Sequence, residues 1–387
     1  MSSKILTKIL NILIGLTLIN LLLQVGFAQT NPVNNTFTIK STILDEDQKV
    51  FVYLPKDYEK SEAKYPVVYL LDGEYNFSFT ADAVKTLSSW TNRMPSCIVI
   101  GITSNNRDRD LTTIPDKSWQ PPQPIPAAGG ANNFLDYIEK ELIPYVDKNY
   151  RTQPLRTIIG HSLGGLFAVN ALSVKPDLFR FYILLDSSIW WDDGRVAKRA
   201  MSYLTSHPNY NGRIAWIRDK IPHEVWFDIN TEFLAFLENK RPAGLLFTFT
   251  ELENETHSSL VFPGTYFGLR EIFSDFAFKF EEKTDLAAVQ KHYRKLSENY
   301  GYSVSIPEQI YNNLSGQLIY LKNFKDAIAA GEAWVKDYPK SSSAYETLGK
   351  AYVENGNKEL AINNLKKSIE LNPENPRAKE LLKQVEK

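Results

Sequence analysis

The stretch RTIIGHSLGGLFAVNALSV, residues 156–174, decides the fold. Its β-branched start and its apolar continuation, separated by small residues, predict a strand, a sharp turn and a helix. Across the turn the chain reads G-x-S-x-G, the pattern of a nucleophile elbow, in which crowding around the serine excludes side chains at Gly160 and Gly164. Ser162 is therefore the candidate nucleophile. The competing interpretation is a tight turn that needs only small residues.

Alternating strand and helix patterns extend on both sides of this stretch. Eight short apolar runs read as strands, and several are near-continuous Val, Ile, Leu and aromatic residues, as expected of strands buried on both faces. The runs span residues 37–44, 49–55, 65–72, 96–103, 156–161, 180–186, 213–218 and 245–252. With helical patterns between them, clearest over residues 132–150, they predict a mostly parallel sheet with helices on both faces, an α/β fold. The segment 112–130, rich in Pro and Gly, is expected to be a loop over the carboxyl edge of the sheet, where ligands bind.

The composition changes after about residue 280, and only amphipathic helical patterns follow. Residues 342–373 resemble a tetratricopeptide repeat in the spacing of their apolar and small residues. The matching positions are Tyr345, Leu348, Gly349, Tyr352, Ala361, Leu365, Ser368 and Pro373. A weaker copy covers residues 308–341. Because two repeats are too few to fold alone, we expect them to dock on the preceding helix or on the larger domain.

The N-terminus has the pattern of a signal peptide. Lys4 and Lys8 are followed by the mostly apolar stretch 9–23 and by small residues at Gly26 and Ala28, which predict export to the periplasm or the medium. The alternative is an uncleaved membrane anchor, and a membrane partner is expected only in that case. The predicted organisation is a signal peptide over 1–29, an α/β domain over 30–282, a connecting helix over 283–307, and repeats with a capping helix over 308–387.

Charge and cysteine content exclude several classes of function. The 387 residues carry a net charge of −1, so there is no electrostatic case for a nucleic acid partner. Cys97 is the only cysteine, which excludes an intramolecular disulfide and a multi-cysteine metal site. The histidines do not have the spacing of a metal motif, so we expect neither a metal nor an organic cofactor.

A serine nucleophile needs a general base, and the chain has five histidines. They are His161, His207, His223, His257 and His292. In an elbow fold the loop after the last strand reaches over the nucleophile, and His257 is the only histidine in that place. His257 is therefore the candidate base. The alternative is a hydrogen-bonded surface histidine.

The acid that orients the base is less well defined. It should stand at the end of a strand between those that carry the serine and the histidine, and Asp219 meets this rule in the chain order Ser, acid, His. Glu255, two residues before His257, competes with it, and Asp228 and Glu232 are alternatives if the strand ends later. A Ser-His dyad without a strong acid is a further alternative.

An oxyanion hole requires two backbone amides near the nucleophile. The amide of Leu163 lies at the start of the helix after the elbow, and the turn after the run 65–72 offers a second donor at Gly73, beside Glu74. A glycine in that turn would let the backbone approach the substrate. The alternative is a simple β-turn.

Several segments carry a family resemblance, among them VYLPKDYEKSEAKYPVVYLLDGEYNF, SSIWWDDG and ETHSSLVFPGTYFGLREIF. They resemble the putative esterase family of α/β-hydrolases, which includes feruloyl, acetyl-xylan, enterochelin and bacillibactin esterases. The resemblance extends over about residues 37–280. The resemblance implies an α/β-hydrolase fold with an eight-stranded sheet, followed by a small all-α domain of repeats. It also implies Ser162 as nucleophile, His257 as base, and an oxyanion hole near Gly73 and Leu163.

The resemblance also points to a substrate pocket. The R-x-R-D-L segment that begins at Arg107 is implied to be structural or substrate-facing, and the Trp-Trp pair is implied to line the pocket mouth. Before that pair, where relatives have Ser-Pro, the chain reads LLDSSIWW, so Asp186 is expected to alter the pocket. The expected pocket residues are Glu74, Arg107, His161, Trp190 and Trp191.

These features predict an exported serine esterase that forms an acyl-enzyme with a siderophore lactone or an acylated carbohydrate. Two other classes remain open. One is a non-catalytic scaffold whose repeats bind a protein partner, and the other is an acyltransferase that uses the same nucleophile.

Overall fold

The computed structural model describes residues 35–56, 58–120, 125–220 and 227–387, and the predicted signal peptide lies outside this part of the chain. Its centre is an eight-stranded sheet in the order β1-β2-β4-β3-β5-β6-β7-β8. The strands are β1 (Asn35–Ser41), β2 (Glu46–Tyr53), β3 (Tyr65–Leu70), β4 (Ile98–Ile102), β5 (Thr152–His161), β6 (Phe181–Leu185), β7 (Gly212–Asp219) and β8 (Leu245–Leu252). β2 pairs antiparallel with β1 and β4, and all other pairs are parallel. The predicted mostly parallel sheet is confirmed.

Helices cover both faces of this sheet. One face carries α4 (Ala131–Tyr137), η4 (Ile138–Leu142), α5 (Ile143–Asn149), α6 (Leu163–Val174), α7 (Trp191–Ser206) and α8 (Phe227–Asn239). The other carries α2 (Gly73–Lys85), η3 (Thr86–Trp90) and α9 (Val261–Ile272). Alternate residues of the inner strands enter the two cores: in β3, Val67 and Tyr69 face one core, and Val68 and Leu70 face the other. The near-continuous apolar runs therefore arise because both faces are buried.

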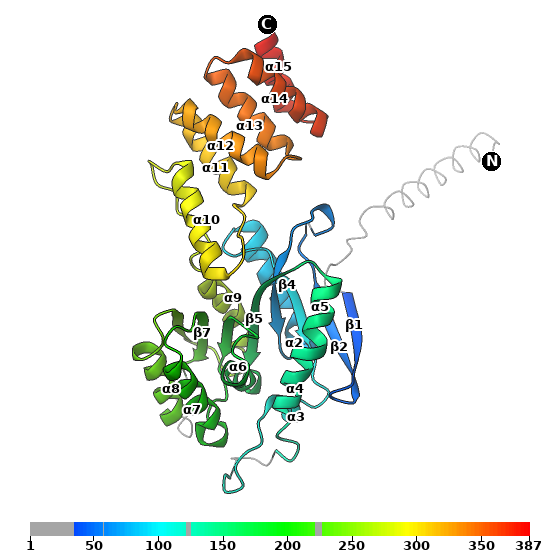
Figure 1. Ribbon diagram of the computed structural model, residues 1–387, viewed down its shortest axis with the longest axis vertical. Helices are drawn as coiled ribbons and strands as arrows, with labels where there is room; N and C mark the ends of the chain where they lie inside the picture. The colour runs from blue at the N-terminus through cyan, green and yellow to red at the C-terminus, as the bar shows by residue number, and fades with distance from the viewer. Residues whose placement is uncertain (1–34, 57, 121–124, 221–226) are drawn as a thin grey trace, which may run out of the picture.

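The C-terminal helices form an arm that extends away from the sheet and ends at the C-terminus (Figure 1). They are α10 (Leu286–Tyr300), α11 (Glu308–Tyr320), α12 (Phe324–Asp337), α13 (Ser342–Glu354), α14 (Lys358–Leu371) and α15 (Pro376–Glu386). The core beneath α2 and α9 continues into the arm as far as Trp334 and Ala351. At the junction, Arg213 pairs with Asp275 at 2.6 Å, and its guanidinium lies 4.9 Å from the ring of Tyr300. The repeats thus pack on α10 through α12, and α10 in turn packs on the larger domain through Tyr300.

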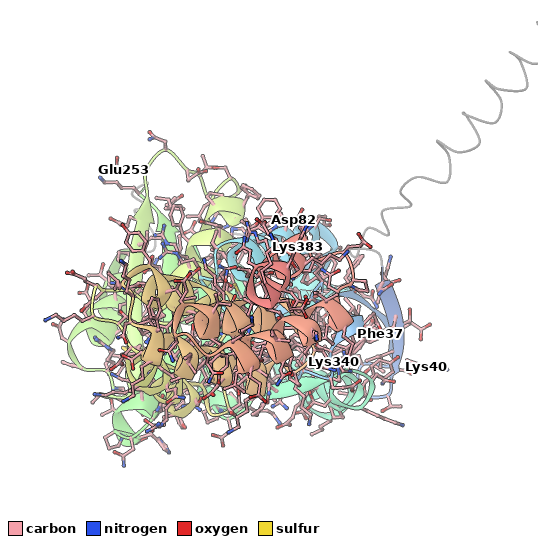
Figure 2. All side chains as sticks on the ribbon, turned by 90° about the horizontal axis from the view of Figure 1, so that it is seen from above. Phe37, Lys40, Asp82, Glu253, Lys340 and Lys383 are labelled. Atoms are coloured by element: carbon pink, nitrogen blue, oxygen red, sulfur yellow. The ribbon has the colours of Figure 1, made fainter. Side chains whose placement is uncertain are left out.

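The arm and the elbow lie at opposite ends of the parallel strands. A cleft of about 980 Å³ separates the arm from the sheet, and its walls include Tyr65 and Gln153, at the amino ends of β3 and β5, and Gln309 of α11. Ser162 follows the carboxyl end of β5. Figure 2 looks down on the arm, with Phe37 of β1 and Glu253 beyond β8 near opposite edges of the sheet. The repeats therefore stand away from the elbow.

Candidate active site

Ser162 occupies the turn between β5 and α6 in a strained conformation, with φ 56° and ψ −117°. Its backbone is held on both sides by β6 and the loop that follows. The N–H of Ser162 donates to the carbonyl of Leu185, and its carbonyl accepts from the N–H of Ser188, each at 3.0 Å. The Oγ atoms of Ser162 and Ser188 are 3.1 Å apart. These bonds hold the hydroxyl at the carboxyl edge of the sheet.

The glycines of the elbow have different roles. A Cβ at Gly160 would lie 2.2 Å from the carbonyl oxygen of Gly164, so a side chain is excluded there, as predicted. A Cβ at Gly164 would meet its nearest atom at 3.5 Å, an ordinary contact, so the prediction of crowding at Gly164 is wrong. The second excluded position is Gly165, whose Cβ would lie 1.8 Å from Ser187 Oγ. The elbow is therefore crowded between β5 and α6 at Gly160, and against the segment after β6 at Gly165.

His257 lies in the loop between β8 and α9, and its Nδ1 is 2.5 Å from Oδ2 of Asp186. Asp186 directly follows β6 and has a left-handed backbone, φ 38°, with its N–H donating to the carbonyl of Ile217 at 2.8 Å. Its side chain is 12% exposed, compared with 38% for His257. A carboxylate in this position fixes the ring orientation and leaves Nε2 as the nitrogen available to the nucleophile.

The structure thus corrects the prediction of Asp219 as the acid. Asp219 is buried at the end of β7, but the carboxylate on His257 Nδ1 is that of Asp186. The competing Glu255 accepts a hydrogen bond from Ser259 at 2.5 Å instead. Glu232 lies on α8, and the side chain of Asp228 lies outside the described part of the chain. A dyad without an acid is not the arrangement observed.

The sequence contained a signal for Asp186 that the prediction did not use. Both β6 and β7 lie between the strands that carry Ser162 and His257, so the rule for the acid admits the residue after either strand. Asp186 ends the buried run RFYILLD in the same way that Asp219 ends its own strand. Asp186 of the segment LLDSSIWW, expected to alter the pocket, is the partner of the base.

His161 supports the loop that carries His257. Its Nε2 is 2.7 Å from the carbonyl oxygen of His257, and the two rings lie 4.5 Å apart. Burial and the neighbouring His257 lower the pKa of His161 to about 4. The ring is therefore neutral near pH 7, so its Nε2–H donates to that carbonyl. His161, expected to line the pocket, joins the elbow to the histidine loop.

Two helix N-termini meet beside Ser162. α2 begins at Gly73 and α6 at Leu163, after the neighbouring parallel strands β3 and β5. Amides of the first helical turn lack partners within their helix, and the helix dipole favours negative charge there. A Cβ at Gly73 would lie 2.6 Å from the backbone of Gly101. The glycine is thus required by packing against β4, whereas the sequence suggested a close approach to substrate.

A partly buried ion pair adjoins these amides. Arg107, the first residue of α3 (Arg107–Leu111), donates from Nε to Oδ1 of Asp72 at 2.6 Å and from Nη2 to Oδ2 at 2.9 Å. The same Nη2 donates to the carbonyl of His161 at 3.1 Å. Burial raises the pKa of the neighbouring Glu74 carboxyl. Nε and Nη2 of Arg107 therefore donate to protein groups of the site.

The two tryptophans differ in their surroundings. Trp190 is half-buried, with its ring centre 6.3 Å from that of Trp119. Trp191 is 1% exposed, donates from Nε1 to the carbonyl of Thr113 at 3.2 Å, and lies 4.7 Å from the ring of Trp119. Its expected place at the pocket mouth is wrong, because its ring is in the core and anchors the segment 112–120. Trp190 remains a candidate for the pocket.

The other histidines lie elsewhere. His207 stacks on Tyr203 at the end of α7, and His292 lies on α10 against Phe278. His223 is outside the described residues. Among the described residues, no group of three or more His, Cys, Asp or Glu side chains could hold a metal ion. None of the helices in this same part of the chain is long and apolar enough to cross a membrane.

Comparison with known proteins shows which family the chain belongs to. Residues 41–257, more than half of the chain, match the family model described as Putative esterase. The chain belongs to the putative esterase family. It is a carboxylic ester hydrolase with the α/β-hydrolase fold that the sequence predicted. Residues 342–375 match the model of the tetratricopeptide repeat, so the esterase carries such a repeat near its C-terminus.

Relatives of this esterase include proteins named for siderophore hydrolysis. It is 33% identical over 193 residues to the ferri-bacillibactin esterase BesA of Bacillus subtilis, a match that covers 44% of this chain and 67% of BesA. It is also 33% identical over 155 residues to the siderophore enterobactin esterase of Emericella nidulans, covering 36% of this chain and 51% of the relative. The crystal structure of an IroE-like serine hydrolase from Shewanella oneidensis superimposes with a TM-score of 0.69 at 29% identity, covering 79% of this chain and 99% of that one.

Proposed function

We propose that the protein is a serine esterase that works through an acyl-enzyme, with Ser162, His257 and Asp186 as its catalytic residues. The observation that carries the proposal is the 2.5 Å contact between His257 Nδ1 and Asp186 Oδ2, beside a serine in a strained elbow. The three residues can act together because each follows a strand, β5, β6 or β8, at the same edge of the sheet. Ser162 is the nucleophile, His257 is the base, and Asp186 orients the base.

In the first step, Ser162 Oγ attacks the acyl carbon and His257 Nε2 accepts its proton. Asp186 stabilises the imidazolium that forms. The negative charge on the former carbonyl oxygen is stabilised by the N–H groups of Gly73 and Leu163, at the N-termini of α2 and α6. The protonated His257 then gives its proton to the leaving alcohol. Water attacks the acyl-enzyme in the same way and releases the acid.

For the substrate we propose a siderophore ester. Two relatives that share 33% identity with this chain are named as siderophore esterases. Trp190 directly precedes α7 and lies two residues after Ser188, whose N–H donates to the carbonyl of Ser162. Its ring and that of Trp119, in the segment after α3, are aromatic surfaces that suit an aromatic acyl group. Acylated carbohydrates, which were an equal expectation from the sequence, serve as the comparison substrates in the test.

The test measures hydrolysis of p-nitrophenyl butyrate, enterobactin, a feruloyl sugar and acetylated xylan by the native protein and by Ser162→Ala. We expect turnover of enterobactin, and a loss of about 10⁶-fold in kcat for the serine variant. Labelling by a fluorophosphonate probe should disappear with the same substitution. Near-normal turnover by the variant would refute the nucleophile, and no turnover of any ester by the native protein would favour the scaffold alternative.

We further propose that the protein is exported and that residues 1–29 are removed. The support is the order of basic, apolar and small residues at the N-terminus. Mass spectrometry of the mature N-terminus after cell fractionation tests this. An intact Met1 in the membrane fraction would instead indicate an anchor.

A further inference from the structure

The cleft between the arm and the sheet lies at the opposite end of the parallel strands from Ser162, and the proposed reaction does not use it. Its volume of about 980 Å³ is near the upper end of the range of about 300–1,000 Å³ for sites that enclose a drug-sized molecule. The sheet side of the wall includes Tyr65 and Gln153, and the arm side includes Glu308 and Gln309 at the start of α11. The cleft therefore has room for a segment of a chain-like ligand.

Positive charge predominates on the walls of this cleft. It is lined by Lys56, Lys64 and Lys85, and within the described part of the chain none of these lysines forms an ion pair. Glu308 is the one carboxylate among the described lining residues, and it accepts a hydrogen bond from Trp334 Nε1 at 3.0 Å. The whole chain has a net charge of −1, so the excess of lysines is local. A cleft lined by one sign of charge attracts ligands of the opposite sign.

Trp90 adds an exposed aromatic face to the cleft. It ends η3, and its side chain is 76% exposed. Among the described residues, no ring packs against the indole and no acceptor binds its Nε1. An exposed indole combines a flat apolar face with one polar N–H, and it suits a ligand that has both apolar and polar surfaces. A sugar ring is such a ligand, because its C–H groups form an apolar face and its hydroxyls project from the edge.

The other polar groups of the cleft suit a ligand rich in hydroxyls. The segment between α10 and α11 exposes Ser303 and Ser305 and buries Val304 and Ile306, the alternation of an extended chain. Six lining side chains have no hydrogen-bond partner within the described residues: Ser89, Asn92, Ser96, Gln153, Ser303 and Ser305. Hydroxyl and amide groups both donate and accept hydrogen bonds, as the hydroxyls of a sugar do.

An acidic peptide is the competing ligand, and the cleft is less suited to it. A peptide that extends a sheet binds along a free edge strand, but the edges of this sheet are β1 and β8, and the cleft lies across strand ends. A helical peptide binds in a continuous apolar groove, whereas lysine, serine and amide side chains interrupt the walls of this cleft. A chain of sugars requires neither feature.

We propose that the cleft between the arm and the sheet binds an acidic polysaccharide, a chain of sugars that carries acidic groups. A sugar ring stacks on Trp90, the acidic groups bind to the lysines, and the free hydroxyl and amide groups bind the sugar hydroxyls. Binding here does not depend on Ser162, His257 or Asp186. It holds the protein on the polymer while the elbow, at the other end of the strands, stays open to its own substrate.

The experiment measures the binding of polygalacturonate, dextran sulfate and neutral dextran to the full chain by isothermal titration calorimetry. We expect at least one acidic polymer to bind, more weakly as the salt concentration rises, and neutral dextran to bind at least about tenfold more weakly. Polygalacturonate carries carboxylates and dextran sulfate carries sulfates. Binding of either one supports the proposal and identifies the acidic group that the cleft accepts.

Trp90→Ala and Lys64→Gln test the aromatic and the charged part of the cleft, with Tyr320→Ala and Lys148→Gln as matched controls. Tyr320 is 85% exposed at the end of α11, Lys148 is exposed on α5, and neither lines the cleft. We expect Trp90→Ala to weaken binding about fivefold or more, and Lys64→Gln about threefold or more at low salt. The controls should change binding less than about twofold. All four variants should keep the native kcat for p-nitrophenyl butyrate and the native melting temperature, because the replaced side chains are exposed and distant from the elbow.

Three results would overturn the proposal. They are the absence of binding to both acidic polymers, equal losses in the cleft variants and their controls, and binding of polyglutamate as tight and as sensitive to Trp90→Ala, which would assign the cleft to an acidic peptide. Failure of the esterase mechanism is recognised separately. Ser162→Ala should bind the polymer like the native protein, so its activity tests the mechanism and its polymer binding tests the cleft.

Discussion

Replacing Asp186 with Asn tests the structural assignment of the acid most directly. The substitution keeps the shape of the side chain and removes the charge that lies 2.5 Å from His257 Nδ1. At an effective dielectric constant of about 20, two unit charges at about 4 Å attract by about 4 kcal/mol. Since 1.36 kcal/mol corresponds to a tenfold rate change, full loss of this term would lower kcat about 10³-fold. Exposure of 38% of the His257 side chain screens the pair, so we expect a fall of about 10² to 10³.

The assay is the steady-state hydrolysis of p-nitrophenyl butyrate at pH 7, with Asp219→Asn and Glu255→Gln as matched controls. Asp219→Asn changes a buried carboxylate at the end of the neighbouring strand, and Glu255→Gln changes one in the same loop as His257. We expect both controls to keep kcat within about tenfold of the native value, with any loss of stability reported by the melting temperature. A native rate in D186N, together with a large loss in D219N, would refute the reasoning.

Three further outcomes are expected. Gly160→Ala should lower the free energy of unfolding by about 3 kcal/mol, because its Cβ would lie 2.2 Å from a carbonyl oxygen, while Gly164→Ala should change it by less than about 1 kcal/mol in urea unfolding. The pKa of His161 is lowered to about 4 in the folded protein, so on acidification the unfolded chain takes up a proton at this histidine first. The free energy of unfolding is therefore full above about pH 6.5 and falls by up to about 3 kcal/mol as the pH drops toward 4. His161→Gln should make urea unfolding less sensitive to pH over that range, and an unchanged pH dependence would contradict this prediction. Trp191→Ala should cost about 3–5 kcal/mol of stability because the ring is 1% exposed, whereas Trp190→Ala should mainly change KM for aromatic esters.

The sequence predicted the features that depend on local pattern. The elbow around Ser162 was recognised because a β-branched run, small residues and an apolar helix follow one another within 19 residues, from 156 to 174. The strands were recognised because burial on both faces makes them continuously apolar. His257 was identified because it is the only histidine in the loop directly after the last strand. The repeat over residues 342–373 was recognised from the spacing of its small and apolar residues.

Tertiary structure alone decided which groups meet. The expected place of the acid, at the end of a strand between those that carry the nucleophile and the base, fits both Asp186 and Asp219. Only the fold in three dimensions brings Asp186 to His257. The clash that requires Gly73 is with Gly101, 28 residues away in the chain. The buried ring of Trp191 donates to the carbonyl of Thr113, 78 residues before it. Nearby residues determine where a strand ends, so the local sequence was enough to place Ser162 in the turn between a strand and a helix. Asp186, which binds the base, and Gly73, which offers the second oxyanion donor, come from segments distant in the chain. A local sequence pattern contains no information on how close such segments lie in the folded protein.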